Sequence, residues 1–299
     1  METYNCDLCG SNQYEVIWDK TEREEQDILR SIVIRDNSGN IVHGINVMCK
    51  CCGLVYIRER MSRGELDRFY QEEYRKIYNE AEGVNTESEH MHAQHAFAIL
   101  NTINLSKVSS ILDIGCSAGQ LLDMFPNIKT AGVEKSQFKT DKHCIYSDIS
   151  EVKSTYDVVT MLNTLEHVYS PIETLNSVYN LLNDSGYLLI SVPDIYNTNI
   201  KKPMDAYLSN AHLYTFSPHT IGLLLNKCGF SVEGYYSIEE EIGNKLYALA
   251  RKAEPIEIEW DMHADTASMK AFLQYVDAVF IGQYLFKRGG CRIEHKNNS

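Results

Sequence analysis

The chain has 299 residues and a formal net charge of −13, from 28 Lys and Arg against 41 Asp and Glu. This length is sufficient for two domains, one of them with a full hydrophobic core. The acidic balance argues against a nucleic-acid substrate, because contacts to phosphate need a basic surface. There is no apolar run of membrane-spanning length and no cationic, apolar leader, so we expect a soluble cytoplasmic protein with no membrane partner.

The first 60 residues contain two short cysteine motifs. The segments Cys6–Gly10 and Cys49–Gly53 both contain the pattern C-x-x-C-G. In a cytoplasmic chain, cysteines point to metal or free thiols before disulfides. Two such motifs are typical of a zinc ribbon, in which four thiolates close a tetrahedral shell around a structural Zn²⁺ ion. We predict a zinc-ribbon domain over residues 1–60, with the ligands Cys6, Cys9, Cys49 and Cys52.

The chain between the cysteine motifs and the central strands predicts a hairpin and then helix. Alternating residues indicate a hairpin of Ile32–Arg35 with Ile41–Val47. Residues 61–105 have helical spacing, because apolar and aromatic side chains recur three and four positions apart from Leu66 to Tyr78. We expect a helical linker that either packs the ribbon on the next domain or forms a lid over a ligand.

The central segment, Ile111–Leu122, predicts a buried strand, a glycine turn and a helix that runs to Phe125. Gly115 and Gly119 remove side chains where a ligand must lie against the backbone. The start of the helix would offer free N–H groups to an anionic part of that ligand. The turn lacks the Gly-Lys-Ser/Thr ending of a P-loop, and Ser117 replaces the second glycine of the dinucleotide-binding pattern. It does fit G-x-S-x-G, the nucleophile elbow of α/β-hydrolases.

The apolar strands predicted after this turn are followed by acidic or polar residues. A carboxylate after the second strand of a nucleotide-binding unit can accept hydrogen bonds from a ribose diol. The strands and the residues that follow them are Thr130–Val133 with Glu134, Cys144–Tyr146 with Asp148, and Tyr156–Leu162 with Asn163.

With these motifs, residues 88 to 252 closely resemble class I S-adenosylmethionine-dependent methyltransferases. The resemblance implies an α/β fold with a Rossmann-like, seven-stranded methyltransferase sheet, and a cofactor-binding domain over residues 106–253. It implies that Asp113 and the glycine turn hold the amino-acid end of the cofactor, that Glu134 binds the ribose, and that Asp148 contacts the adenine. The hydrolase elbow predicts none of these acids.

The resemblance extends to a full set of cofactor contacts and to a lid. Aromatic and arginine residues precede the cofactor motif in related methyltransferases, so the lid interpretation places Tyr74 and Arg75 on the cofactor and Tyr78 on the substrate. The cofactor-binding residues that it implies are Asp113, Gly115, Cys116, Ser117, Gly119, Glu134, Lys135, Asp148, Ile149, Leu162, Asn163, Tyr74 and Arg75.

Beyond the fourth strand, the sequence predicts two capped helices and the last three strands of the sheet. Ser170 and Ser217 each precede a proline, which is the pattern of a helix N-terminus. The three strands are Tyr187–Val192, Phe230–Ile238 and Lys245–Arg251.

Residues 254–299 form the last predicted segment. It contains a helix, Ala264–Phe286, whose apolar stripe must be buried. We expect that stripe either to pack on its own chain or to form a homodimer contact.

Methyl transfer mainly requires alignment of the partners and often a base for the acceptor's proton. Histidine is the side chain that changes charge nearest to neutral pH. In sugar methyltransferases of similar layout, histidines at the positions of His167 and His212 lie beside the transferred methyl, which implies a general base here. Both histidines also have a structural interpretation. The substrate-binding candidates are Tyr78, Glu166, Tyr207 and Tyr214.

Zinc-bearing amino-terminal domains also occur on methyltransferases that act on nucleotide-linked sugars, so the resemblance favours a small-molecule sugar acceptor. Two other functions stay open. One is an RNA- or protein-directed methyltransferase that docks its substrate on the ribbon, although the acidic charge weakens the RNA version. The other is a methyltransferase-like binding module without turnover.

Overall fold

The computed structural model describes residues 2–19, 34–35, 41–42, 44–73, 86–136, 141–195, 208, 211–239, 244–260, 264, 266–267 and 269–274. None of the helices in these ranges combines the length and the apolar character that crossing a membrane requires.

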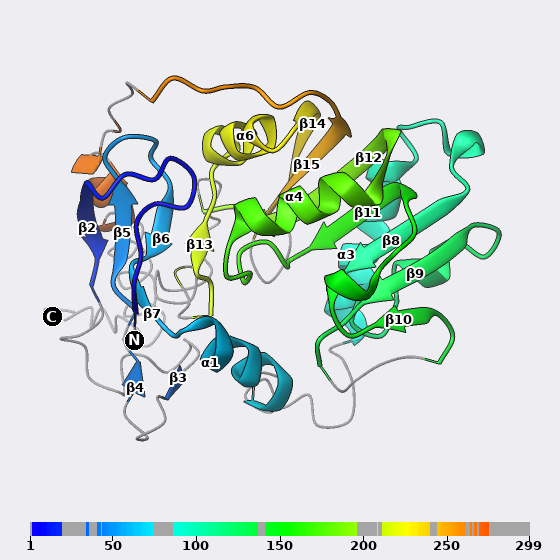
Figure 1. Ribbon diagram of the computed structural model, residues 1–299, viewed down its shortest axis with the longest axis horizontal. Helices are drawn as coiled ribbons and strands as arrows, with labels where there is room; N and C mark the ends of the chain where they lie inside the picture. Colours follow the sequence, from blue (N-terminus) through cyan, green and yellow to red (C-terminus); the bar gives the residue numbers. More distant parts are fainter. Residues whose placement is uncertain are drawn as a thin grey trace, which may run out of the picture.

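A seven-stranded sheet forms the centre of the molecule (Figure 1), with the strand order β10-β9-β8-β11-β12-β15-β14. The strands from β10 to β12 are parallel, and β15 runs antiparallel to both of its neighbours. The strand bounds are β8 Ser110–Ile114, β9 Lys129–Val133, β10 Cys144–Tyr146, β11 Tyr156–Leu162, β12 Leu182–Pro193, β14 Phe230–Ile238 and β15 Lys245–Lys252. The predicted seven-stranded α/β sheet is confirmed.

Helices cover both faces of this sheet, which explains why its inner strands are apolar at nearly every position. Side chains of neighbouring positions on β8 alternate between the two faces, so that Ile111 and Leu112 belong to different hydrophobic clusters. The cluster of Leu112 contains residues of α4 (Pro171–Leu181) and α6 (Pro218–Lys227), and the cluster of Ile111 contains residues of α3 (Thr86–Leu100). In Figure 1, α4 lies in front of the sheet and α3 behind it.

The two predicted helix starts are confirmed. The side chain of Ser170 accepts a hydrogen bond from Glu173 N at the start of α4, and that of Ser217 accepts one from Thr220 N at the start of α6. Gly229 follows α6 with a φ of +84°, a conformation that glycine adopts without cost.

A smaller four-stranded sheet, of order β13-β6-β5-β2, lies beside the central one (Figure 1). Three of its strands come from the cysteine-containing segment, and β13 comes from the chain between β12 and α6, which the sequence did not predict. The bounds are β2 Tyr14–Trp18, β5 Asn46–Cys49, β6 Val55–Ile57 and β13 Tyr214–Thr215.

Two strand pairs and a helical segment complete the amino-terminal part. The predicted hairpin is confirmed in part as the pair β3 (Ile34–Arg35) and β4 (Ile41–Val42), whereas residues 46 and 47 of its predicted second strand belong to β5. A second pair joins β1 (Glu2–Thr3) to β7 (Glu59–Arg60). The predicted helical linker contains α1 (Arg63–Arg68), the π-helical turn η1 (Phe69–Glu73) and α3. Short 3₁₀ turns also occur at η2 (Leu105–Lys107) and η4 (Ile149–Glu151).

The carboxyl-terminal segment returns to the amino-terminal sheet. Within the helical residues 269–274, Met269 and Leu273 are buried in a cluster with Ile17, Trp18 and Met48. The described part of the predicted C-terminal helix therefore packs on its own chain.

Candidate functional site

The glycine turn after β8 closes directly against β9. The amides of Gly115 and Cys116 donate to Val133 O at 2.8 and 3.2 Å. Gly115 has a φ of +78°, and a Cβ on this residue would collide with the hydroxyl of Thr164, which follows β11. Ser117 also lies in the left-handed region, with a φ of +49°. Such backbone strain in a residue other than glycine is typical of functional sites.

One expectation for this turn is wrong. The predicted helix to Phe125 is only the 3₁₀ turn η3 (Leu122–Met124), because Pro126 disfavours helical geometry at the residue before it. Four N–H groups of the turn are used within the protein. Besides the two amides bound to Val133 O, Gly119 N donates to Cys116 O at 2.8 Å and Ser117 N donates to a carboxylate oxygen of Glu134 at 2.9 Å.

This geometry also removes the hydrolase interpretation. A nucleophile elbow needs a strand-to-helix turn and a histidine base beside its serine. Here no α-helix follows the turn, and the hydroxyl of Ser117 donates to Glu89 Oε1 at 3.1 Å.

Acidic side chains, rather than free N–H groups, characterise the turn. Asp113, near the end of β8, is 3% exposed, and Thr160 Oγ1 donates to its Oδ1 at 2.6 Å. Burial raises the pKa of the Asp113 carboxyl to about 7; the hydrogen bond from Thr160 opposes this shift, and the carboxylates of Glu134 and Glu89 add to it. A buried carboxyl with such a perturbed pKa is a candidate for a functional group.

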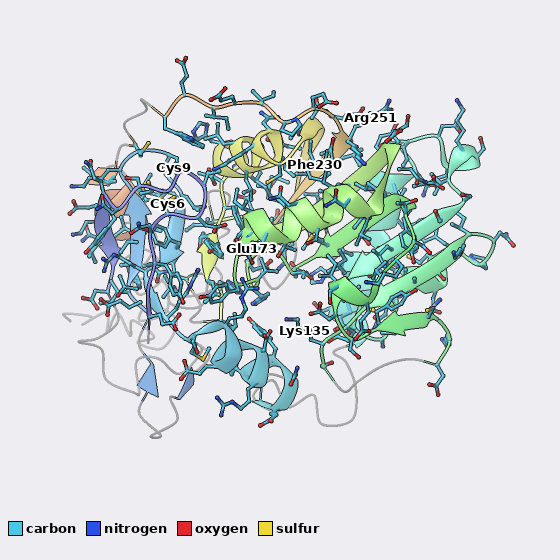
Figure 2. All side chains as sticks on the ribbon, in the orientation of Figure 1. Cys6, Cys9, Lys135, Glu173, Phe230 and Arg251 are labelled. Atoms are coloured by element: carbon cyan, nitrogen blue, oxygen red, sulfur yellow. The ribbon has the colours of Figure 1, made fainter. Side chains whose placement is uncertain are left out.

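The predicted acids after β9 and β10 lie at the carboxyl edge of the sheet. Glu134 is 8% exposed, and its carboxylate accepts hydrogen bonds from Ser117 N and, at 2.8 Å, from Ser136 N. Asp148 is half-buried, and the hydrogen bond from Ser150 N lowers the pKa of its carboxyl. The ammonium of Lys135, which Figure 2 labels, is paired with a residue of α1, since it lies 2.5 Å from Asp67 Oδ1.

Helix α3 contributes two residues that sequence reasoning did not assign to the site. The carboxylate of Glu89 accepts hydrogen bonds from Ser117 Oγ and, at 2.6 Å, from Gln120 Nε2. His92 is 8% exposed, and its Nδ1 lies 3.1 Å from Asn163 Nδ2. The two residues are three positions apart and therefore share a helix face, which is the one signal that could have identified them.

Asn163, directly after β11, is the second strained residue other than glycine in the described chain, with a φ of +48°. Its Oδ1 is buried and has no hydrogen-bond partner among the described residues. An unpaired buried acceptor is costly unless a ligand or water donates to it. The predicted cofactor residue Leu162 is the last residue of β11, so both lie at the same edge of the sheet as Asp113.

The two predicted catalytic histidines lie side by side, next to Glu166. The rings of His167 and His212 are 4.8 Å apart between centroids. His167 Nδ1 lies 2.9 Å from both Ala211 O and the hydroxyl of Tyr70. His167 Nε2 is 3.9 Å from Glu166 Oε1. The sequence-predicted residues Glu166, His167 and His212 therefore form one group at the carboxyl edge of the central sheet.

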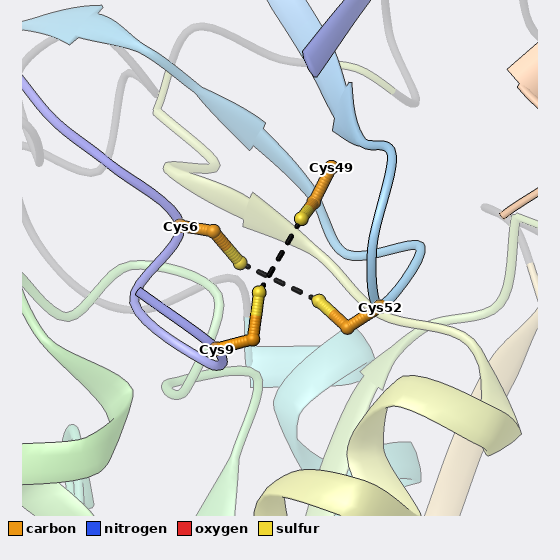
Figure 3. A group of neighbouring side chains, drawn as sticks. All are labelled: Cys6, Cys9, Cys49 and Cys52. Atoms are coloured by element: carbon orange, nitrogen blue, oxygen red, sulfur yellow. Dashed lines mark hydrogen bonds between the residues drawn. The ribbon is translucent and has the colours of Figure 1, made fainter. Parts of the chain in front are cut away.

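The four predicted metal ligands also converge (Figure 3). The Sγ–Sγ distances are 3.5 Å for Cys6 with Cys52 and for Cys9 with Cys49. These are too long for disulfides and close to the sulfur separation around a tetrahedral Zn²⁺ with bonds of about 2.3 Å. Four converging thiols are a donor set that Zn²⁺ binds in the thiolate form.

Both C-x-x-C-G motifs, Cys6–Gly10 and Cys49–Gly53, contain the tight turn that such a metal site needs. Gly10 N donates to Cys6 O at 2.8 Å and Gly53 N donates to Cys49 O at 3.0 Å, and both glycines have positive φ. Each C-x-x-C-G motif therefore forms a tight turn that ends at its glycine.

The cysteine unit is joined to the central domain by polar contacts. The carboxylate of Asp7 accepts hydrogen bonds from Ile172 N at 3.1 Å and Ser170 Oγ at 3.0 Å, at the start of α4. Lys227 of α6 donates to Leu8 O at 2.6 Å. The guanidinium of Arg60, 4% exposed, lies over the rings of three tyrosines, Tyr4, Tyr169 and Tyr214.

This interface includes Tyr214, a predicted substrate contact. Its hydroxyl accepts a hydrogen bond from Arg60 Nη2 at 2.9 Å and donates to Tyr169 O at 3.0 Å, and the side chain is 1% exposed. The Tyr214 hydroxyl is thus held within the protein. Four other predicted site residues, Tyr74, Arg75, Tyr78 and Tyr207, lie outside the described residues.

Comparison with known proteins identifies the family. Residues 66–234 match a family model described as a methyltransferase domain. No protein of curated function matches the sequence. A solved 1,6-didemethyltoxoflavin-N1-methyltransferase from Burkholderia thailandensis, with bound 1,6-didemethyltoxoflavin and S-adenosylhomocysteine, is 15% identical with a TM-score of 0.54, over 70% of this chain and 96% of that chain.

A magnesium protoporphyrin IX methyltransferase from Synechocystis PCC 6803, solved with S-adenosylhomocysteine, is 14% identical with a TM-score of 0.47, over 64% of this chain and 100% of that chain. The Burkholderia structure supports the fold, and the family model covers more than half of the 299 residues. The chain therefore belongs to the methyltransferase domain family.

Proposed function

We propose that this protein transfers a methyl group from S-adenosylmethionine to a small-molecule acceptor. The observation that carries the proposal is the acidic glycine turn, in which Asp113, Glu134 and Glu89 lie close to Ser117 and Asn163 Oδ1 has no described partner. S-adenosylmethionine supplies a methyl group on a cationic sulfonium, and it carries an ammonium and a ribose diol. These cationic and hydrogen-donating groups complement the carboxylates and the unpaired amide oxygen.

The same features disfavour a nucleotide whose phosphates rest on the turn. A pyrophosphate needs unoccupied N–H groups at the turn, and those of Gly115, Cys116, Ser117 and Gly119 are all used within the protein. Three carboxylates near the turn would also repel it.

For the acceptor, we propose a sugar, and in particular a nucleotide-linked sugar. The support is the amino-terminal four-cysteine unit, which the sequence shares with methyltransferases of that class. We propose that this unit holds a structural Zn²⁺ ion, because four thiols leave no coordination position for a substrate. We also propose that His212 or His167 acts as general base, since both lie beside the buried Glu166 at the carboxyl edge of the sheet.

Calorimetric binding of S-adenosylhomocysteine to the parent protein and to Glu134→Ala tests the cofactor assignment. We expect micromolar binding by the parent and at least a hundredfold weaker binding by the variant, because the Glu134 carboxylate is expected to bind both ribose hydroxyls. Glu233→Ala, which removes an exposed glutamate of β14, is the matched control and should bind like the parent. A folded parent that does not bind the ligand would contradict the proposed function.

The acceptor class is tested by methyl transfer from labelled S-adenosylmethionine into separate pools of nucleotide sugars, RNA and protein. Label in the nucleotide-sugar pool is the expected result. Label in RNA or protein instead would mean that the small-molecule acceptor is wrong, and label in none of the pools would favour a binding module.

A further inference from the structure

Glu166 is a buried carboxylate that lacks hydrogen-bond partners within the described chain. The residue is 1% exposed, and neither carboxylate oxygen has a hydrogen-bond partner among the described residues. Burying an unpaired carboxylate costs several kcal/mol, so such a group persists where a cation balances it. Two imidazoles, those of His167 and His212, lie close to it.

The three residues have the donors and the spacing of a metal site. Each offers one ligand atom, and these atoms lie within 4.8 Å of one another. The His167 Nε2 to Glu166 Oε1 distance of 3.9 Å is too long for a hydrogen bond, and it exceeds the separation of two adjacent metal ligands by less than about 1 Å. A small contraction around an ion would therefore complete the site.

The orientation of His167 matches that of a metal ligand. Its Nδ1 lies 2.9 Å from the carbonyl oxygen of Ala211, which can only accept, so a hydrogen bond between them places the hydrogen on Nδ1. The lone pair is then on Nε2, on the side of Glu166. Metal-binding histidines typically donate their other ring N–H to a backbone carbonyl in this way. Tyr70 supports the same carbonyl, since its hydroxyl donates to Ala211 O at 3.1 Å.

We propose that Glu166, His167 and His212 bind a divalent first-row transition-metal ion, such as Mn²⁺, Fe²⁺, Co²⁺ or Zn²⁺. Two imidazoles and one carboxylate suit these ions, and three protein ligands leave positions open for an acceptor. The site is distinct from the four-cysteine site, whose sulfur donors prefer Zn²⁺ and which has four protein ligands.

The inference rests on the proposed methyltransferase function and narrows its acceptor to a hydroxyl compound. A metal ion lowers the pKa of a hydroxyl bound to it, so that the oxygen becomes nucleophilic at neutral pH. The acceptor O–H bond then breaks and its proton passes to water. The oxygen forms a bond to the methyl carbon, and the carbon–sulfur bond breaks with its electron pair moving to sulfur. The histidines then serve as ligands instead of as the general base.

The test is a titration of the full chain, first loaded with Zn²⁺ at the four-cysteine site, with Mn²⁺. Free Mn²⁺ is followed by its electron paramagnetic resonance signal, because Mn²⁺ prefers oxygen and nitrogen donors to thiolates. We expect one Mn²⁺ bound per chain, at least tenfold weaker binding by Glu166→Gln and by His212→Ala, and unchanged binding by His219→Ala, which removes an exposed histidine at the start of α6.

Spin-echo modulation of the bound Mn²⁺ should also show coupling to imidazole nitrogen. Failure of the parent to bind Mn²⁺ at millimolar concentration, or bound Mn²⁺ without nitrogen coupling, would overturn the metal site. Binding of S-adenosylhomocysteine, measured on the same samples, keeps the two proposals separate. If it is retained without Mn²⁺ binding, the methyltransferase proposal stands with a histidine base and the metal is wrong.

Discussion

At the scale of single residues, the site is defined by how it places negative charge. Asp113 has a pKa of about 7 because its carboxyl is buried and because Glu134 and Glu89 lie near it. The raised pKa means that the folded chain holds this proton more tightly than the unfolded chain does. Asp113 therefore contributes stability that is largest at low pH and is lost as the pH rises from about 4 to about 7.

Ligand affinity should show the opposite dependence on pH. The ammonium of S-adenosylhomocysteine favours the ionised carboxylate, so binding below pH 7 must release the Asp113 proton. We expect the affinity to rise as the pH increases from 6 to 7, by up to about tenfold if one proton is released, and to level off by pH 8. Calorimetry in buffers of different ionisation enthalpy measures the proton release directly. In Asp113→Asn the affinity should be lower and nearly independent of pH, and Asp184→Asn, at an exposed position, should follow the parent.

At the scale of elements, the two edges of the central sheet have separate roles. The carboxyl edge of the sheet carries Asp113, Glu134 and Asn163. At the amino edge, the carboxylate of Asp157 accepts hydrogen bonds from Ser109 N at 2.8 Å, Ser110 N at 3.1 Å and Asn183 Nδ2 at 2.6 Å, and so connects β8, β11 and β12. Burial raises the pKa of Asp157, but these hydrogen bonds and those from the serine hydroxyls lower it more, to about 2.

Asp157→Asn should therefore lower stability without changing ligand binding. The asparagine side chain would place its own N–H donors against the donors that now bind the carboxylate. We expect this change to cost about 1–3 kcal/mol of unfolding free energy at neutral pH. Because the pKa of Asp157 is depressed, its contribution is complete above about pH 4 and is lost as the pH falls towards 2. Urea unfolding at pH 7 measures the change, with Asp184→Asn as control. A variant as stable as the parent would show that the connection is not needed.

Helices and strands could be predicted from the sequence where a local residue pattern specifies them. The apolar runs of β8 and β11 and the Ser-Pro starts of α4 and α6 were all predicted. The predicted helix after the glycine turn is wrong because Pro126 ends it after one 3₁₀ turn. Strand β13 has only two residues and pairs with β6 far away in the sequence, so no local pattern indicates it.

The candidate site residues could also be predicted only where a local pattern indicates them. Residues that directly follow strands, such as Glu134 and Asn163, could be assigned by position, because carboxyl strand ends meet at one edge. Glu89 and His92 were not assigned, because they approach Ser117 and Asn163 from a helix whose place on the sheet is decided by tertiary packing. The buried position of Tyr214 could not be predicted either, because it depends on Arg60, from another part of the chain.

At the scale of the whole molecule, the cysteine unit and the catalytic unit share structure. Tyr214 N of β13 donates to Glu166 O at 3.3 Å, and Leu213 O accepts from Ile57 N of β6 at 2.9 Å. The strand next to His212 is therefore held on one side by the small sheet and on the other by the segment that carries Glu166. Loss of the metal proposed for the four cysteines should therefore loosen the chain around His212, at the candidate acceptor site.

Cys9→Ser should lower the zinc content below one per chain and loosen β13. We expect amide hydrogen exchange over residues 211–216 to become at least tenfold faster, while exchange over β8 changes little, because β8 lies between strands of the central sheet. Cys144→Ser, at an exposed cysteine outside the cluster, is the matched control. Equal protection of residues 211–216 in both variants would contradict this coupling.

The origin of β13 also has a consequence for synthesis of the protein on the ribosome. Strand β6 emerges early, but the strand that pairs with its free edge is not available until residues 214 and 215 have left the exit tunnel. During that interval β6 presents unpaired backbone groups, which are a template for intermolecular strand pairing. The cysteine unit thus reaches its final form only after most of the catalytic domain has been translated, although it occupies the start of the chain.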